Sequence, residues 1–276
     1  MSNLRLITIN QTDLATLSAL PAAVATLPVT NLQNDMRARV MRSTSTADQQ
    51  ILGDLPSPDV ADGISLARHN FSTQATVQVR LFDGVGQTGS CVYDSGAVDV
   101  VEPIAVGVFR VGIDAWGAKA LPYADIWTHW FPAVAYRSFE ITISDGGNVD
   151  GYLQAGRLFL GLSLSPSSNF DWGSALEFIE DTRQESTAGG TLRSEGGNQR
   201  RRFPFDLSLM SPSDRERFVN ELRRVGMMKT VLISAYPGAG GALEADHTLV
   251  AKMSSAPRYS TVQGGYFQSK FVFDEA

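Results

Sequence analysis

The sequence predicts a mainly β protein, in which an N-terminal β-sandwich is followed by a second β-domain that carries one short α-helix. Three observations support this fold class. Apolar and polar residues alternate in short runs, such as Thr76–Phe82, and a period of two is that of a half-buried strand. Turns rich in Gly, Asp and Ser separate these runs, which is typical of an antiparallel sandwich. Only the stretch 212–225 has a clear helical spacing.

The composition suits a globular chain and excludes several function classes. The 276 residues are 43% hydrophobic and include 25 Gly and 12 Pro, which indicates a turn-rich protein with one large or two ordinary domains. The net charge of −6 argues against nucleic acid or an anionic membrane as a partner. The single Cys91 leaves no intrachain disulfide and no cysteine-cluster metal site. No apolar run reaches the roughly 20 residues of a membrane span. The N-terminus lacks a secretory pattern, so we expect folding in a cytoplasm.

The N-terminal half reads as a succession of short strands. Residues 1–30 predict an opening strand and a surface segment interrupted by Pro21 and Pro28, because proline holds its predecessor in extended geometry. The arginine-rich stretch 37–42 is interpreted as a solvated edge, since exposed charges are weak signals. The further predicted strands lie within 63–70, 76–82, 92–102 and 106–113.

Two strands near residue 150 predict a domain boundary. Alternate positions of Phe139–Ile143 are apolar, and the Asp-, Asn- and Gly-rich stretch 145–151 predicts a turn. The returning strand, 152–160, ends in three consecutive apolar residues, and a strand that is apolar on both faces needs cover on both. We therefore expect one domain over residues 1–161 and a second over 162–276, packed together at this strand.

The second domain is expected to contain one helix within a β frame. Ser211 can cap the helix, Pro212 suits its first turn, and Asp214 lies where a capping box places an acid. Gly226 can end the helix, so its range is 212–225. The apolar residues at helical spacing are Phe218, Val219, Leu222 and Val225.

A polar, Gly-rich segment over 182–202 predicts a long hairpin with little reason to be ordered alone. It ends in Arg200, Arg201 and Arg202. Two interpretations remain open. The segment is an arm that orders against a neighbouring subunit, whose acids these arginines pair with, or it is a hairpin tip with its arginines in solvent.

We predict no enzyme activity and no cofactor. His69, His129 and His247 are far apart and share no motif spacing with Cys91 or with a serine in a nucleophile elbow, so we interpret them as structural or surface residues. A glycan-cleaving enzyme would need two positioned carboxylates, and nothing selects a pair from the 29 acids. The stretch 238–241 is interpreted as a hairpin tip and not as a phosphate cradle, because no Lys-Ser/Thr follows and no helix is expected after it.

Two residue groups are candidate binding sites. Asp145, Asn148 and Asp150 offer oxygen ligands of the kind that Ca²⁺ binds, but the same residue types form turns without an ion, and we favour the turn. A second group consists of aromatic residues in a segment expected to be rich in loops. These can stack on sugars or anchor a partner, or pack in the core, which we favour. They are Trp116, Tyr123, Trp127, Trp130 and Phe131.

Four stretches carry a resemblance to a known family, namely 31–43, 67–70, 79–84 and 150–161. In this order they resemble tail-tip structural proteins of long-tailed bacteriophages, the distal tail or minor tail proteins. The N-terminal portion of that family is similar to discoidin-like jelly rolls, a sandwich also used by carbohydrate-binding modules. The helix-bearing β-domain resembles the tail-tube-like domain of distal tail proteins, which assembles as a ring. Met41 stands where this resemblance expects an aromatic residue.

The resemblance implies a structural protein of the virion that joins the tail tube to the baseplate. Its expected partners are copies of itself in a ring, for which a hexamer is the expected form, together with tail-tube and baseplate hub proteins. It would be assembled in the host cytoplasm. The alternative is a carbohydrate-binding, receptor-binding module of a tail or cell-surface protein, with a host surface glycan as ligand. A tail-ring protein should form hexamers, whereas a sugar binder should be monomeric.

Overall fold

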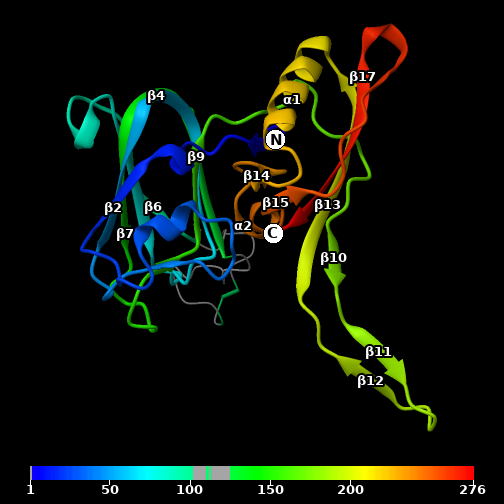
Figure 1. Cartoon of the computed structure of the whole chain (residues 1–276), viewed down its shortest axis with the longest axis horizontal. Coiled ribbons are helices and arrows are strands. Elements are labelled where there is room, and N and C mark those ends of the chain that lie inside the picture. The colour runs from blue at the N-terminus through cyan, green and yellow to red at the C-terminus, as the bar shows by residue number, and fades with distance from the viewer. Residues whose placement is uncertain (1, 102–109, 112, 114–124) are drawn as a thin grey trace.

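The computed structural model describes residues 2–101, 110, 111, 113 and 125–276. These residues form two β-rich parts that lie side by side (Figure 1). The predicted mainly β fold class is confirmed. Of the α-helices in the described residues, only α1 (Pro212–Val225) is longer than two turns, and the other is α2 (Gly241–Asp246). Short 3-10 turns cover Gln11–Leu14, Val29–Gln33, Val85–Gln87 and Gln263–Gly265.

In chain order the strands are β1 (Arg5–Ile7), β2 (Thr16–Leu20), β3 (Met41–Arg42), β4 (Gln49–Ala67), β5 (Thr76–Phe82), β6 (Cys91–Asp99), β7 (Ile126–Ser144), β8 (Gln154–Ala155), β9 (Arg157–Gly161), β10 (Glu177–Glu180), β11 (Arg183–Ser186), β12 (Leu192–Glu195), β13 (Gln199–Met210), β14 (Val231–Ser234), β15 (Thr248–Met253), β16 (Ser260–Thr261) and β17 (Phe267–Glu275).

The N-terminal sandwich is built on the long antiparallel pair β4 and β7. The order of its main sheet is β2-β4-β7-β5-β6, and β9 also pairs with β4. Strand β2 pairs with the first half of β4 and β9 with the second half, so the neighbours change along the strand. The register of the β4–β7 ladder shifts where Pro56 and Pro58 lie in β4 and where Pro132 lies in β7. Proline cannot donate to the ladder, so both strands are interrupted at these positions.

Two details of this part differ from the sequence predictions. Residues 126–131, expected in a loop-rich segment, belong to strand β7, because Trp127 and Phe131 point into the sandwich core on one face. Met41, where the family resemblance expects an aromatic residue, is only 1% exposed and packs in the same core.

The C-terminal part is one sheet with α1 packed against it. The strand order is β1-β14-β15-β17-β13-β10, and β16 pairs with β17. Helix α1 begins as predicted, because the Ser211 side chain accepts the Asp214 N–H at 3.1 Å, and it ends at Gly226 with a φ of +62°. Its predicted apolar stripe is buried at Phe218, Leu222 and Val225.

Strand β1 lies in a different sheet from the one that the sequence predicts. The opening strand was expected in the N-terminal domain, but Arg5 lies opposite Ser234, so β1 is an edge strand of the C-terminal sheet. The reason is burial, since Leu4 and Leu6 are fully buried in the core of that sheet. The division into folding units at Gly161 stays a prediction.

Helix α2 differs from a second expectation. The sequence analysis expects no helix after residues 238–241, but the chain forms a helical turn directly after Gly240.

Strand β9 joins the two parts. Leu158 and Leu160 pack in the sandwich core, while Phe159 points to the other side and packs against Leu232 and Val250 of the C-terminal sheet. All five residues of β9 are buried. The apolar run therefore has the cover on both faces that its pattern predicts.

Ionic and polar contacts reinforce this joint. Arg157, which is 2% exposed, donates to both carboxylate oxygens of Asp13 at 2.6 and 2.9 Å and lies 3.1 Å from Asp35. Asp35 also accepts a hydrogen bond from the Thr230 hydroxyl of the C-terminal part at 2.5 Å.

Candidate functional site

An arm, residues 177–202, projects from the C-terminal sheet. At its root, β10 pairs with the first residues of β13 (Glu177 opposite Arg202). Farther out, β11 pairs with β12, and neither strand pairs with any other described element. The arm therefore extends away from the body as a two-stranded ladder (Figure 1). The predicted hairpin is present, with strands on both sides of its turn.

Ion pairs within the chain hold the root of the arm. Arg201 donates to Glu275 through Nη2 at 2.8 Å and Nε at 3.1 Å, and both side chains are 12% exposed. Burial acts to raise the pKa of Glu275, but the hydrogen bonds from Arg201 outweigh it and the pKa is lowered. Arg202 donates to both oxygens of Asp274 at 2.6 and 2.9 Å, which lowers the pKa of Asp274. The root of the arm is therefore fixed in direction.

These contacts bear on the predicted role of the three arginines. Two of them, Arg201 and Arg202, already pair with acids of their own chain. Arg200 is the most exposed of the three and lies 3.4 Å from Asp181. One of the two sequence interpretations had all three arginines pair with acids of a neighbouring subunit, and the other left them in solvent. The structure instead uses two of them to fix the arm, and an intersubunit role for Arg200 stays a prediction.

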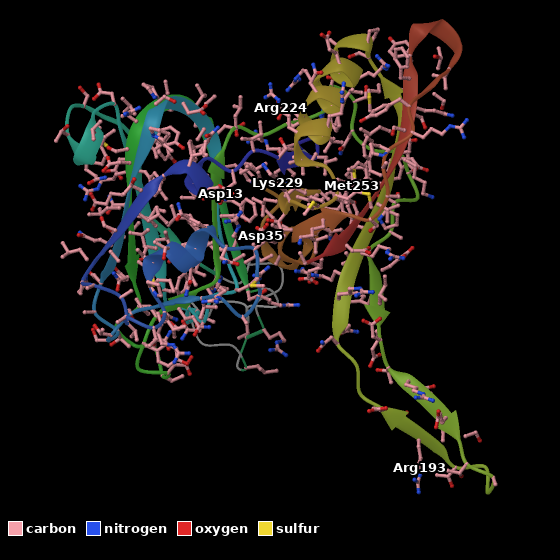
Figure 2. All side chains as sticks on the ribbon, viewed as in Figure 1. Asp13, Asp35, Arg193, Arg224, Lys229 and Met253 are labelled. Carbon is pink, nitrogen blue, oxygen red and sulfur yellow. The ribbon has the colours of Figure 1, made fainter. Side chains whose placement is uncertain are left out.

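Large apolar side chains are exposed in the arm, at Phe178 and Leu192, and elsewhere on the C-terminal part, at Leu209 and Trp172. Phe178 and Leu192 are each 60% exposed, Leu209 is 59% exposed, and Trp172 is fully exposed. The side chains of the outer arm stand clear of the body, with Arg193 near the tip (Figure 2). Phe178 and Leu192 are therefore available for contact with another molecule.

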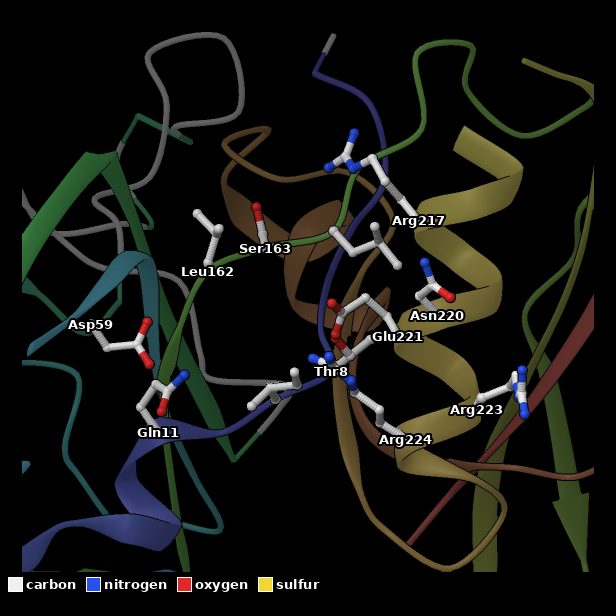
Figure 3. A pocket seen from close by; sticks show the side chains of 12 residues that line it. Thr8, Gln11, Asp59, Leu162, Ser163, Arg217, Asn220, Glu221, Arg223 and Arg224 are labelled. Carbon is white, nitrogen blue, oxygen red and sulfur yellow. The ribbon is translucent and has the colours of Figure 1, made fainter. Parts of the chain in front are cut away.

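A groove lies between α1 and the sandwich (Figure 3). Its volume is about 910 Å³, and residues far apart in sequence line it, including Leu162 and Leu164 after β9 and Arg217 and Arg224 from α1. Glu221 in the groove accepts a hydrogen bond from the Thr8 hydroxyl at 3.3 Å. No sequence signal identifies this groove, because its lining residues come from segments that are far apart in the sequence.

The described residues of the predicted aromatic cluster do not present an exposed surface on which a sugar or a partner protein could stack. Trp116 and Tyr123 lie outside the described residues. Trp127 is 3% exposed and stacks on the ring of His129, to which the Tyr93 hydroxyl is hydrogen-bonded at 2.8 Å. Trp130 is partly buried, and the Arg5 guanidinium lies 5.0 Å over its ring. The described tryptophans of the cluster therefore lie in the core or beneath an arginine.

The candidate calcium ligands are engaged with protein donors. Asp145 accepts hydrogen bonds from the Ser72 N–H and hydroxyl at 2.8 and 2.5 Å and from the Asn148 amide at 2.9 Å. Asp150 accepts from the Asn70 amide at 2.8 Å. These contacts fit the favoured interpretation as turn residues. Within the described ranges, no group of three or more His, Cys, Asp or Glu is placed to hold a metal ion.

The three histidines lie in separate structural settings. His69 stacks on Phe71, its Nε2 is buried without a hydrogen-bond partner, and burial lowers its pKa to about 4. Burial also lowers the pKa of His129. His247 follows α2 and its Nδ1 lies 3.0 Å from the carbonyl of Leu243.

Comparisons with known proteins give no family for the chain. No protein-family model matches it, and no curated protein does. Among solved structures, a GH29 fucosidase of Ruminococcus gnavus in complex with fucose aligns at 12% identity with a TM-score of 0.39, over 57% of this chain but only 27% of its own length. Two further similar structures are carbohydrate-binding modules, and each is covered over 98% of its length.

The first of these two is chitosan-binding module 1 from a chitosanase/glucanase of Paenibacillus sp. IK-5, at 12% identity and a TM-score of 0.38 over 55% of this chain. The second is the family 32 module of Clostridium perfringens NanJ in complex with galactose, at 12% identity and a TM-score of 0.37 over 57% of this chain. Identities and TM-scores this low assign no function. In the part of the chain that the structure describes, no helix has the length and apolar character of a membrane span.

Proposed function

We propose that this chain is a structural protein that assembles with copies of itself through the arm. The observation that carries the proposal is a projecting two-stranded ladder with large apolar side chains exposed and a root fixed by ion pairs. In a monomer, the open strand edges and the exposed Phe178 and Leu192 favour aggregation. In a defined assembly, a neighbouring copy covers them. The fixed root reduces the conformational entropy that is lost on binding.

We further propose that the assembly is a ring in the tail tip of a long-tailed bacteriophage, where it joins the tail tube to the baseplate. The sequence resemblance supports this proposal, as does the combination of a sandwich with a helix-bearing β-domain. The partners are then other copies of the chain, the tail tube and the hub proteins. The proposal assigns neither catalysis nor a cofactor, and the location is the virion.

Electron microscopy and sedimentation equilibrium of the purified full-length chain test this function. The expected result is closed rings of uniform diameter, with a mass that is a multiple of 29.8 kDa. A monomer at every soluble concentration would overturn the proposal.

The second candidate function is carbohydrate binding by the sandwich, the alternative that the sequence leaves open. One edge of the sandwich favours it, because polar groups lie there beside an aromatic ring. The Arg42 guanidinium lies 4.0 Å over the ring of Tyr152, and the Asn70 amide donates to Asp150 at 2.8 Å. Because Arg42 covers one face of this ring, a sugar would bind through its hydroxyls to the guanidinium, amide and carboxylate groups and to the remaining part of the ring.

Titration with a panel of monosaccharides and chitosan oligosaccharides, followed by NMR, tests the second candidate. We expect saturable shifts that disappear in Tyr152→Ala and persist in Tyr266→Ala, a partly exposed tyrosine of the C-terminal part. Identical titrations for both variants, or no saturable shift at all, would show that this edge of the sandwich does not bind sugar.

A further inference from the structure

We infer that the sandwich edge at Arg42 and Tyr152 binds a sugar that carries a carboxylate, such as a uronic acid. This inference rests on the second candidate function, carbohydrate binding, and names the class of sugar. Three features of the edge support it. They are a guanidinium that uncharged groups hold in place, an end of that guanidinium that is open to solvent, and a single amide that fixes the polar groups beside it.

Uncharged groups hold the guanidinium of Arg42 in one position. Its Nε and Nη2 atoms donate to the same oxygen, Oε1 of Gln154, at 3.2 and 2.8 Å. Its central carbon lies 4.0 Å from the centroid of the Tyr152 ring. The antiparallel register of β3 and β8 places Arg42 directly opposite Gln154, and side chains at such positions lie next to each other on one face. The backbone pairing therefore aligns the guanidinium with its amide partner.

Arg42 differs from the other fixed arginines because it has no acidic partner. Arg157 donates to both oxygens of Asp13. Arg201 does the same with Glu275. In the part of the chain that the structure describes, Arg42 forms no ion pair, and its side-chain hydrogen bonds go to an amide. Its positive charge is therefore available to a group outside the chain.

One end of the Arg42 guanidinium is open to such a group. The Gln154 oxygen occupies the side formed by Nε and Nη2. Nη1, on the other side, donates to no described residue and is not among the buried polar atoms, so solvent reaches it. The N–H groups of Nη1 and Nη2 match the two oxygens of a carboxylate. Because the side chain is already held in place, less conformational entropy is lost when a ligand binds.

The side-chain amide of Asn70 fixes the groups beside the guanidinium. Its nitrogen donates to Asp150 at 2.8 Å and to the carbonyl of Tyr152 at 3.1 Å. Its oxygen accepts the backbone N–H of Gln154 at 2.8 Å. One side chain therefore sets the positions of the carboxylate, the ring and the amide that make up the edge.

Asp150 narrows the class of ligand. Its carboxylate is exposed and, when ionised, only accepts hydrogen bonds, so it binds hydroxyl groups and repels an anion. A ligand that suits both charged residues presents hydroxyls to Asp150 and a carboxylate to Arg42. A neutral sugar lacks the second of these groups and a simple carboxylate such as acetate lacks the first, whereas a sugar acid has both.

Paired titrations followed by NMR test the inference, with galacturonate against galactose and glucuronate against glucose as probes. We expect each acid to bind the wild-type chain about ten-fold more tightly than its neutral counterpart, and we expect added salt to reduce this preference. Arg42→Gln should abolish the preference and leave the binding of the neutral sugars in place. Arg39→Gln is the matched control, because it removes the same charge from an exposed position nearby in the sequence, and it should keep the preference.

The Nε–H resonance of Arg42 provides a measurement on the wild-type chain, which is decisive if Arg42→Gln melts at a lower temperature. Galacturonate should shift this resonance in a saturable way, and galactose should shift it less. Acetate at the same concentration should also shift it less, because acetate offers Asp150 no hydroxyl. Equal shifts with galacturonate and acetate would overturn the assignment to a sugar acid.

The outcomes separate the inference from the candidate function on which it rests. No saturable shift with any of the four sugars overturns both. Equal affinities for the acids and their neutral counterparts overturn the inference and leave sugar binding standing. An acid preference that persists in Arg42→Gln also overturns the inference, because the carboxylate would then bind elsewhere.

Discussion

Arg201 and Glu275 form a two-pronged ion pair at the root of the arm, with nitrogen–oxygen distances of 2.8 and 3.1 Å. The backbone N–H of Arg201 adds a third hydrogen bond to the same carboxylate at 2.9 Å. The guanidinium also donates to the carbonyl of Asp246 at 3.1 Å. The last strand of the chain therefore fixes the direction of the arm.

Removing this pair should destabilise the folded chain. Arg201→Ala leaves the Glu275 carboxylate, which is 12% exposed, without its main partner, so we expect the free energy of unfolding to fall by about 2 kcal/mol. Arg200→Ala is the matched control, because Arg200 is 41% exposed and its loss should cost about 0.5 kcal/mol or less. Urea denaturation measures both. Equal losses would contradict a structural role for Arg201.

His69 should make stability depend on pH between about 6.5 and 4. Burial lowers its pKa from 6.5 to about 4, and Asp145 is the charged group that acts in the opposite direction. In this window the unfolded chain binds a proton and the folded chain does not. Stability is therefore fully present above pH 6.5 and is lost as the pH falls toward 4, by up to about 3 kcal/mol.

His69→Asn removes this titration and keeps an acceptor for the Phe71 N–H, which now bonds to Nδ1 at 3.2 Å. Denaturation at a series of pH values should give a flatter curve for the variant across the window. The same pH dependence in both proteins would show that other groups cause it.

The sandwich should need the C-terminal sheet over β9 in order to stay soluble. A fragment of residues 10–161 exposes Phe159 and Ala67, which the C-terminal sheet buries in the whole chain, so we expect poor solubility. Phe159→Ser in the same fragment should raise the soluble yield. A soluble fragment that unfolds cooperatively without this substitution would show that the two parts are separable as they stand.

Local patterns made the strands and the helix predictable. The helix required only its caps, Ser211 and Gly226, and an apolar stripe, all within a few turns of each other. The double burial of β9 followed from three consecutive apolar residues. The hairpin of the arm followed from the polar, glycine-rich composition of residues 182–202.

Contacts between distant residues could not be predicted. Strand β1 pairs with β14 across more than 200 residues, and nothing in the sequence of β1 indicates that it pairs with β14. Asp214 was expected to complete a capping box, but its carboxylate accepts hydrogen bonds from the N–H and hydroxyl of Ser167. The groove and the root of the arm depend on contacts of the same kind. The groove and the root of the arm could therefore be identified only in the structure.

Trimming the arm tests the central claim, self-assembly through the arm, most directly. Residues 182–197 are replaced by Asn-Gly, a two-residue hairpin turn, between Asp181 and Asn198, whose backbones are hydrogen-bonded at 3.3 Å. Sedimentation equilibrium then compares the trimmed and full-length chains at matched concentration and salt. We predict an oligomer for the full-length chain and a monomer with an unchanged melting temperature for the trimmed chain. A trimmed chain that keeps the mass of the full-length assembly would contradict the claim.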